Sequence, residues 1–171
     1  MLVLSFASAA AASAQGRITI PATAQLAVQV SATTPQREAL GGDVAHYTWD
    51  VRLGPGPHDV IRLHRVVRED RPNEPAKLVQ AVMFFPGAPT YFNGLYLTPR
   101  ISDVPARDRA IAIYLAKNNV DVWGMDYRWA MVPEDTTDFG FMRKWGVQRD
   151  VEDAQIALTL ARWIRGEWSR L

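Results

Sequence analysis

The segment LVQAVMFFPGAP, residues 78–89, carries the strongest indication of architecture in the chain. Residues 78–85 form a nearly continuous apolar run, which is typical of a strand covered on both faces in a parallel sheet. The run stops at Pro86-Gly87, so we expect a tight turn at the carboxyl edge of the sheet. Open α/β sheets bind ligands at that edge, and main-chain N–H groups held there can stabilise an oxyanion. A plain exit from strand to loop is the alternative.

Upstream of this segment, the pattern predicts an antiparallel hairpin. Residues 45–53 and 60–67 both alternate between apolar and polar side chains, as half-buried strands do. Gly54-Pro55-Gly56-Pro57 lies between them and supplies a turn. Residues 15–44 are rich in Thr, Ala, Pro and Gln, and we expect an extended N-terminal arm there with at most one strand.

Downstream, the hydrophobic period changes to that of helices. We expect a helix over residues 105–118, ended by a left-handed residue at Asn118-Asn119, and a short strand over 120–126. Residues 147–165 carry an apolar stripe at three- and four-residue spacing and predict a second helix. A hairpin that leads into parallel strands with covering helices defines an α/β fold with a mostly parallel sheet.

Composition excludes several classes of function. The 171 residues correspond to about one domain, at roughly 150 residues each. No cysteine is present, which excludes a disulfide framework, a zinc ribbon and a cysteine nucleophile. The formal net charge is +1 with mixed signs, so nothing supports binding to nucleic acid.

The N-terminus has the composition of a secretory signal. Residues 1–14 are uncharged and apolar and end in Ala12-Ser13-Ala14, the small-x-small form of a cleavage site. The segment is shorter than the roughly 20 apolar residues that span a bilayer. We therefore expect a signal peptide over 1–14, no transmembrane segment, and a secreted or periplasmic protein; a plain alanine-rich tail is the alternative.

From Tyr47 to Leu171 the chain resembles the α/β-hydrolase fold, and lipases and esterases in particular. Pro86-Gly87-Ala88 stands where that family usually has His-Gly-x. The segment 115–128 is similar to the family's helix, left-handed cap and fourth strand, which typically ends in Asp-x-Arg-Gly; here it ends in Asp126-Tyr127-Arg128, and Trp129 replaces the glycine. Residues 138–146 are similar to the segment that precedes the nucleophile strand.

The resemblance implies a serine esterase or lipase, with a small-molecule ester as substrate and no cofactor or metal. Carried over by position, the main-chain N–H groups of Ala88 and Gly87 would form the oxyanion hole. No serine lies in a Gly-x-Ser-x-Gly elbow, and no histidine occupies the family's late position. We therefore expect residues 45–171 to be the N-terminal portion of a hydrolase domain, without a catalytic triad and inactive alone.

Two other functions remain open at this point. A haloalkane dehalogenase or epoxide hydrolase uses an aspartate nucleophile on the same fold, but the former places a halide-binding Asn at the position of Ala88, which has no side-chain donor. A non-catalytic binding module would keep the fold and lack the triad.

Four groups of side chains are candidate sites. His58-Asp59 and His64, with Asp50, could suggest metal ligation, although ordinary strand-face histidines suit their spacing better. An acidic loop could hold a cation or simply be solvated. A structural ion-pair role is favoured for Asp126 and Arg128. Trp123 and Trp129 flank the carboxyl edge of the sheet and could line a pocket, although a core position is favoured for Trp123. The acidic loop comprises Glu134, Asp135 and Asp138.

Overall fold

A computed structural model describes residues 31–98 and 109–166 of the chain, and the expected hairpin lies at the centre of its sheet. The two hairpin strands pair antiparallel in continuous register, from Val44 opposite Arg68 to Arg52 opposite Val60. The strands are β1 (Ser31–Ala32), β2 (Gln36–Gly41), β3 (Val44–Arg52), β4 (Val60–Arg71), β5 (Glu74–Pro75), β6 (Gln80–Phe84) and β7 (Val120–Asp126).

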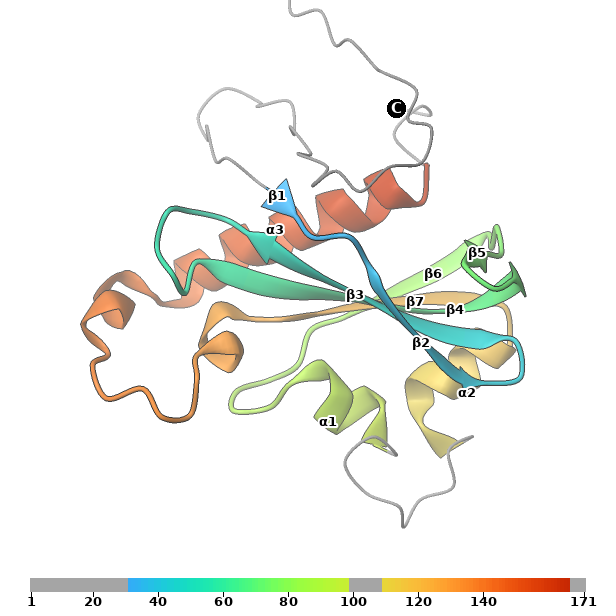
Figure 1. Cartoon of the computed structure of the whole chain (residues 1–171), viewed down its shortest axis with the longest axis horizontal. Helices are drawn as coiled ribbons and strands as arrows, with labels where there is room; N and C mark the ends of the chain where they lie inside the picture. The colour runs from blue at the N-terminus through green and yellow to red at the C-terminus, as the bar shows by residue number, and fades with distance from the viewer. Residues whose placement is uncertain (1–30, 99–108, 167–171) are drawn as a thin grey trace, which may run out of the picture.

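The order along the sheet is β1-β3-β4-β7-β6, with β2 also on β3 and β5 on β4 (Figure 1). The expectation of a mostly parallel sheet is wrong, because β6 and β7 are the one parallel pair among the described strands. The reason is that β7 inserts between β6 and the hairpin, so its other neighbour β4 runs antiparallel to it. Residues 31–41 of the expected N-terminal arm add further antiparallel strands to β3.

The helices cover both faces of the sheet. One face carries α1 (Phe92–Tyr96) and α2 (Ile111–Lys117), and the other carries α3 (Val147–Ile164), as Figure 1 shows. Residues 105–108 of the first expected helix lie outside the described residues. The left-handed position after α2 is confirmed at Asn119, whose φ is 62°. Two 3₁₀ turns, η3 (Arg128–Met131) and η4 (Gly140–Lys144), connect β7 to α3. No helix in the described part of the chain is long and apolar enough to span a bilayer.

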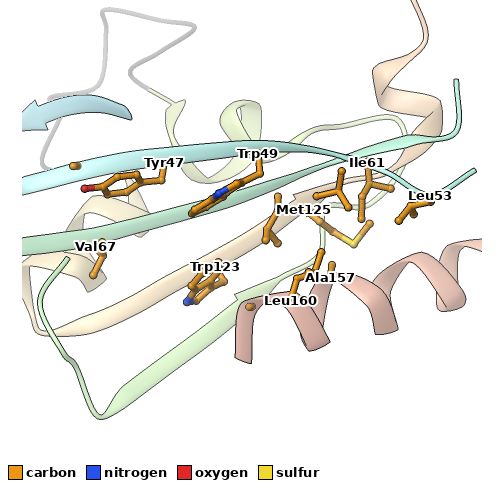
Figure 2. Packing of buried hydrophobic residues seen from close by; sticks show 13 residues of the cluster. Tyr47, Trp49, Leu53, Ile61, Val67, Trp123, Met125, Ala157 and Leu160 are labelled. Carbon is orange, nitrogen blue, oxygen red and sulfur yellow. The ribbon is translucent and has the colours of Figure 1, made fainter. Parts of the chain in front are cut away.

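Alternate residues of the strands feed two separate cores, because successive side chains of a strand point to opposite faces. On the α3 face, Trp49 stacks on Trp123 with ring centroids 5.9 Å apart, and Leu160 of α3 belongs to the same cluster (Figure 2). Trp123 is therefore a core residue, as expected. On the α1 and α2 face, Val44, Val66 and Phe92 belong to the second cluster.

Strand β6 differs from the expected strand buried on both faces. Within the described residues it pairs with β7 on one side only, and its side chains are half-buried or exposed. Val79, just before it, is 96% exposed. An apolar strand with a row of unpaired N–H and C=O groups is a template for pairing with another chain.

We therefore expect residues 1–171 on their own to self-associate through the β6 edge. Val79→Glu places a charge beside that edge without touching the core, and should raise the monomer fraction in size-exclusion chromatography. Val147→Glu is the matched control, because Val147 is 80% exposed but lies on α3. A monodisperse wild-type monomer, or equal effects of the two substitutions, would contradict this prediction.

Candidate functional site

The loop that follows β6, residues 85–91, lies at the carboxyl end of the parallel strand pair. Gly87, Ala88 and Pro89 are exposed, and Pro86 is buried. Gly87 C=O accepts the Thr90 N–H at 2.8 Å and also the Thr90 hydroxyl, which closes a turn. Within the described residues, the N–H groups of Gly87 and Ala88 donate to no protein group. They are thus available to an acceptor from solvent or from a ligand.

Both ends of this loop are attached to the end of β7. The loop leaves the sheet at Phe84, which is in register with Gly124. It returns at Phe92, whose N–H donates to Asp126 Oδ1 at 2.6 Å. Hydrogen bonds to charged groups contribute about 1.5–3 kcal/mol, so this contact is a substantial anchor. The carboxylate also satisfies the first free N–H of α1, whose N-cap residue, Tyr91, makes no side-chain cap.

A glycine in β7 allows this close return of the chain. A Cβ on Gly124 would lie 2.1 Å from Cδ2 and 2.2 Å from Cε2 of the Phe92 ring. That ring is wholly buried, and it stacks on His64 with centroids 4.5 Å apart and an interplanar angle of 16°. The missing side chain at position 124 therefore lets α1 pack directly on the sheet.

A chain of buried polar groups continues from Asp126 into the sheet. Asp126 Oδ2 lies 2.9 Å from His64 Nε2, and His64 Nδ1 lies 3.0 Å from His46 Nε2. The exposed fractions of His46, His64 and Asp126 are 2%, 0% and 6%. Burial, together with the neighbouring His64, lowers the pKa of His46 from 6.5 to about 3. His46 is therefore neutral in the folded protein at physiological pH.

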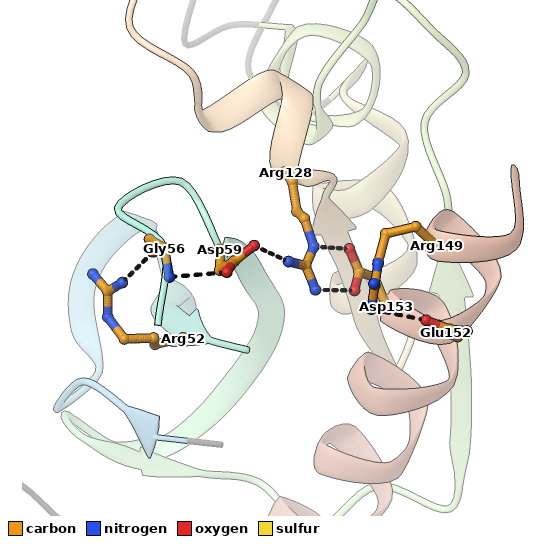
Figure 3. Close-up of polar contacts among 7 residues, drawn as sticks. All are labelled: Arg52, Gly56, Asp59, Arg128, Arg149, Glu152 and Asp153. Carbon is orange, nitrogen blue, oxygen red and sulfur yellow. Dashed lines mark hydrogen bonds and ion pairs between the residues drawn. The ribbon is translucent and has the colours of Figure 1, made fainter. Parts of the chain in front are cut away.

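On the opposite face, Arg128 joins three elements (Figure 3). Its Nε and Nη2 bind the carboxylate of Asp153 on α3 at 2.6 and 2.7 Å, and its Nη1 binds Asp59 Oδ1 at 2.5 Å. Asp59 in turn accepts the Gly56 N–H at 3.0 Å. A Cβ on Gly54 would lie 2.5 Å from Asp59 Oδ2, so the glycine of this turn makes room for the carboxylate.

Asp126 and Arg128 have the structural role that the sequence predicted, but their partners were not predicted. Each makes a buried ion-pair or hydrogen-bond network, Asp126 with His64 and Arg128 with Asp153 and Asp59. His46 and His64 were not recognised as a pair. The signal was available in the predicted hairpin, because a turn centred on residues 54–59 places these two histidines on neighbouring strands and on one face.

The candidate metal ligands do not converge. His58 stacks on Phe141 at 4.3 Å, Asp50 pairs with Arg62 at 2.7 Å, and His64 belongs to the buried chain described above. Over residues 31–98 and 109–166, no three His, Asp or Glu side chains form a group that could hold a metal. The acidic loop is solvent-exposed at Glu134, Asp135 and Asp138.

The fold is similar to that of a solved structure. No protein-family model and no curated protein matches the sequence. Among solved structures, one described as a "putative lipase" from Sulfolobus solfataricus matches with a TM-score of 0.58 and 24% identity. The match covers 72% of this chain and 35% of that chain, so this chain spans about a third of its length. Over the matched residues, this chain therefore shares the fold of that structure.

The contact between Gly124 and Phe92 generates a stability prediction. Gly124→Ala should lower the free energy of unfolding by about 2 kcal/mol, because the new Cβ would overlap the wholly buried Phe92 ring. Gly87→Ala is the matched control, since a Cβ at that position meets nothing within 4 Å. Urea unfolding of the purified protein measures both; equal losses would contradict the argument.

The buried histidine generates a pH prediction. The folded-state pKa of His46 is about 3 against 6.5 when unfolded, so the unfolded chain binds more protons between these values and stability falls as pH falls through that window. The expected loss is about 2 kcal/mol between pH 7 and pH 5, from 1.36 kcal/mol per pKa unit. His46→Gln removes the titrating group. In urea titrations, the free energy of unfolding of this variant should therefore depend less steeply on pH between pH 5 and pH 7.

Glu69→Gln is the control for His46→Gln. The Glu69 carboxylate binds Arg37, Tyr47 and the Asn73 N–H, and the guanidinium of Arg37 is the main cause that lowers its pKa from 4.5 to about 2. The stability that the Glu69 carboxylate contributes to the fold is lost only as the pH falls below about 4.5. Glu69→Gln should therefore leave the slope between pH 5 and 7 unchanged; a flattened slope there would show that His46 is not the source.

Proposed function

We propose that this chain is part of an α/β-hydrolase-type serine esterase or lipase, in which the loop 85–91 supplies main-chain donors to the oxyanion. One observation carries the proposal: the N–H groups of Gly87 and Ala88, which have no partner among the described residues, lie on a loop attached at both ends to the carboxyl end of β7. The likeness to the Sulfolobus solfataricus protein supports the hydrolase-type fold. The nucleophile, acid and base would lie outside these 171 residues.

The proposed chemistry is acyl transfer from a small-molecule ester to a serine, followed by hydrolysis. In the tetrahedral intermediate the ester carbonyl oxygen becomes an anion, and preorganised N–H donors stabilise it. Ala88 contributes only its main chain, since a methyl group cannot donate a hydrogen bond. The exposure of Gly87 and Ala88 leaves their N–H groups accessible to a substrate.

Removal of one donor tests the proposal in the protein made from the complete reading frame. Ala88→Pro deletes the N–H of residue 88, and should lower kcat for p-nitrophenyl esters by about 10²–10³-fold with little change in KM. Ala88→Ser retains the N–H and should keep near wild-type activity. Residues 1–171 alone should show no turnover above buffer.

Two results would contradict the esterase proposal. One is a complete protein that hydrolyses no ester. The other is equal activity of Ala88→Pro and Ala88→Ser, with both variants folded by circular dichroism, which would exclude this N–H as an oxyanion donor.

Export is a second part of the proposal, and it rests on the apolar, uncharged residues 1–14 and their Ala12-Ser13-Ala14 ending. We expect cleavage between Ala14 and Gln15. N-terminal sequencing of the protein from its native host, with cell fractionation, measures it. An intact Met1 terminus in the cytosolic fraction would contradict export.

A further inference from the structure

The chain of buried groups His46, His64 and Asp126 ends on the N–H of Phe92, the residue that follows the candidate oxyanion loop. Asp126 accepts one hydrogen bond on each oxygen, from the Phe92 N–H at 2.6 Å and from His64 Nε2 at 2.9 Å. His64 meets His46 Nε2 at 3.0 Å through its other nitrogen. We call these three side chains the relay. It extends from β3 through β4 to the end of β7.

Hydrogen-bond chemistry fixes the direction of the link to Asp126. An ionised carboxylate has no proton to donate, so His64 Nε2–H is the donor to Asp126. The second link joins His64 Nδ1 and His46 Nε2, and its donor depends on the tautomer. Each link restrains the orientation of the next side chain.

Ring packing strengthens the same connection. The His46 and His64 rings lie nearly parallel, with an interplanar angle of 9° and centroids 5.2 Å apart. The Phe92 ring stacks on His64 at 4.5 Å and against Gly124, so the residue that ends the loop is held by its ring and by its N–H. The relay therefore defines the position at which the chain returns from residues 85–91.

We propose that His46, His64 and Asp126 are positioning residues that hold the loop 85–91 through the Phe92 N–H, and thereby place the N–H groups of Gly87 and Ala88 for an oxyanion. This inference rests on the proposed esterase function for its catalytic consequence. None of the three side chains needs to touch the substrate. Their effect is to limit the motion of a loop whose own turn, between Gly87 and Thr90, is otherwise exposed.

Hydrogen exchange in the complete protein tests the anchor without reference to activity. Mass spectrometry should show that Asp126→Ala speeds exchange in peptides covering residues 85–96 by about tenfold or more, because the Phe92 N–H loses its acceptor. Asp126→Asn keeps an amide oxygen for that N–H and should return exchange to within about threefold of wild type. His46→Leu removes the far link and should give a smaller increase, while His46→Gln retains a side chain that can hydrogen-bond.

Tyr47→Phe is the matched control for these variants. Tyr47 follows His46 on β3, is buried, and hydrogen-bonds Glu69 on β4, so the variant loses a buried contact on the other side of the sheet. It should leave exchange in residues 85–96 unchanged. If Asp126→Ala fails to fold, His46→Leu, two links from the loop, provides the measurement.

Measurements of ester hydrolysis distinguish the positioning role of the relay from the proposed esterase function. Asp126→Ala should lower kcat for p-nitrophenyl esters by tenfold or more at nearly constant KM, and Asp126→Asn should recover most of it. Equal exchange in Asp126→Ala, His46→Leu and Tyr47→Phe would overturn the relay. Faster loop exchange in a complete protein that hydrolyses no ester at all would instead overturn the proposed function, and with it the catalytic consequence of the relay.

Discussion

The hydrogen bond between the Asp126 carboxylate and the Phe92 N–H is the constraint on which the rest of this face depends. It joins the end of one strand to the start of α1, across 34 positions of sequence. Without it the first amide of a five-residue helix would lack a cap, since Tyr91 provides none. The same carboxylate orders His64, so a single group connects loop, helix and sheet.

The absence of a side chain at Gly124 is the steric complement of that bond. Phe92 occupies the space that a Cβ would take, and its ring covers the buried His64. A larger residue would push α1 off the sheet and lengthen the contact between Phe92 and Asp126. Electrostatics and packing are therefore coupled at this position: the ring excludes water from the histidines, and the dry surroundings keep His46 neutral.

The sequence pattern predicted the hairpin, strand β7 and helix α3, because each has a clear period and a turn or cap at its ends. It did not predict the mostly antiparallel sheet. Strand order depends on which strand inserts beside β4, and nothing local to residues 120–126 reveals that neighbour. The partners of Asp126 and Arg128 were missed for the same reason, since His64 and Asp153 lie 62 and 25 positions away. Gly87 and Ala88 were placed correctly at a strand end because their position follows from chain order alone.

Asp126 and Arg128 together show how the end of β7 serves both faces of the sheet. The strand stops at Asp126, and the chain turns into η3 at Arg128, so two residues that would share a face in a continued strand take opposite sides. Asp126 holds α1 on one face, and Arg128 holds α3 and the β3–β4 turn on the other. The carboxyl edge is thus fixed from both layers by charged groups that are nearly buried. The same contacts that complete the fold therefore also fix the geometry of this edge.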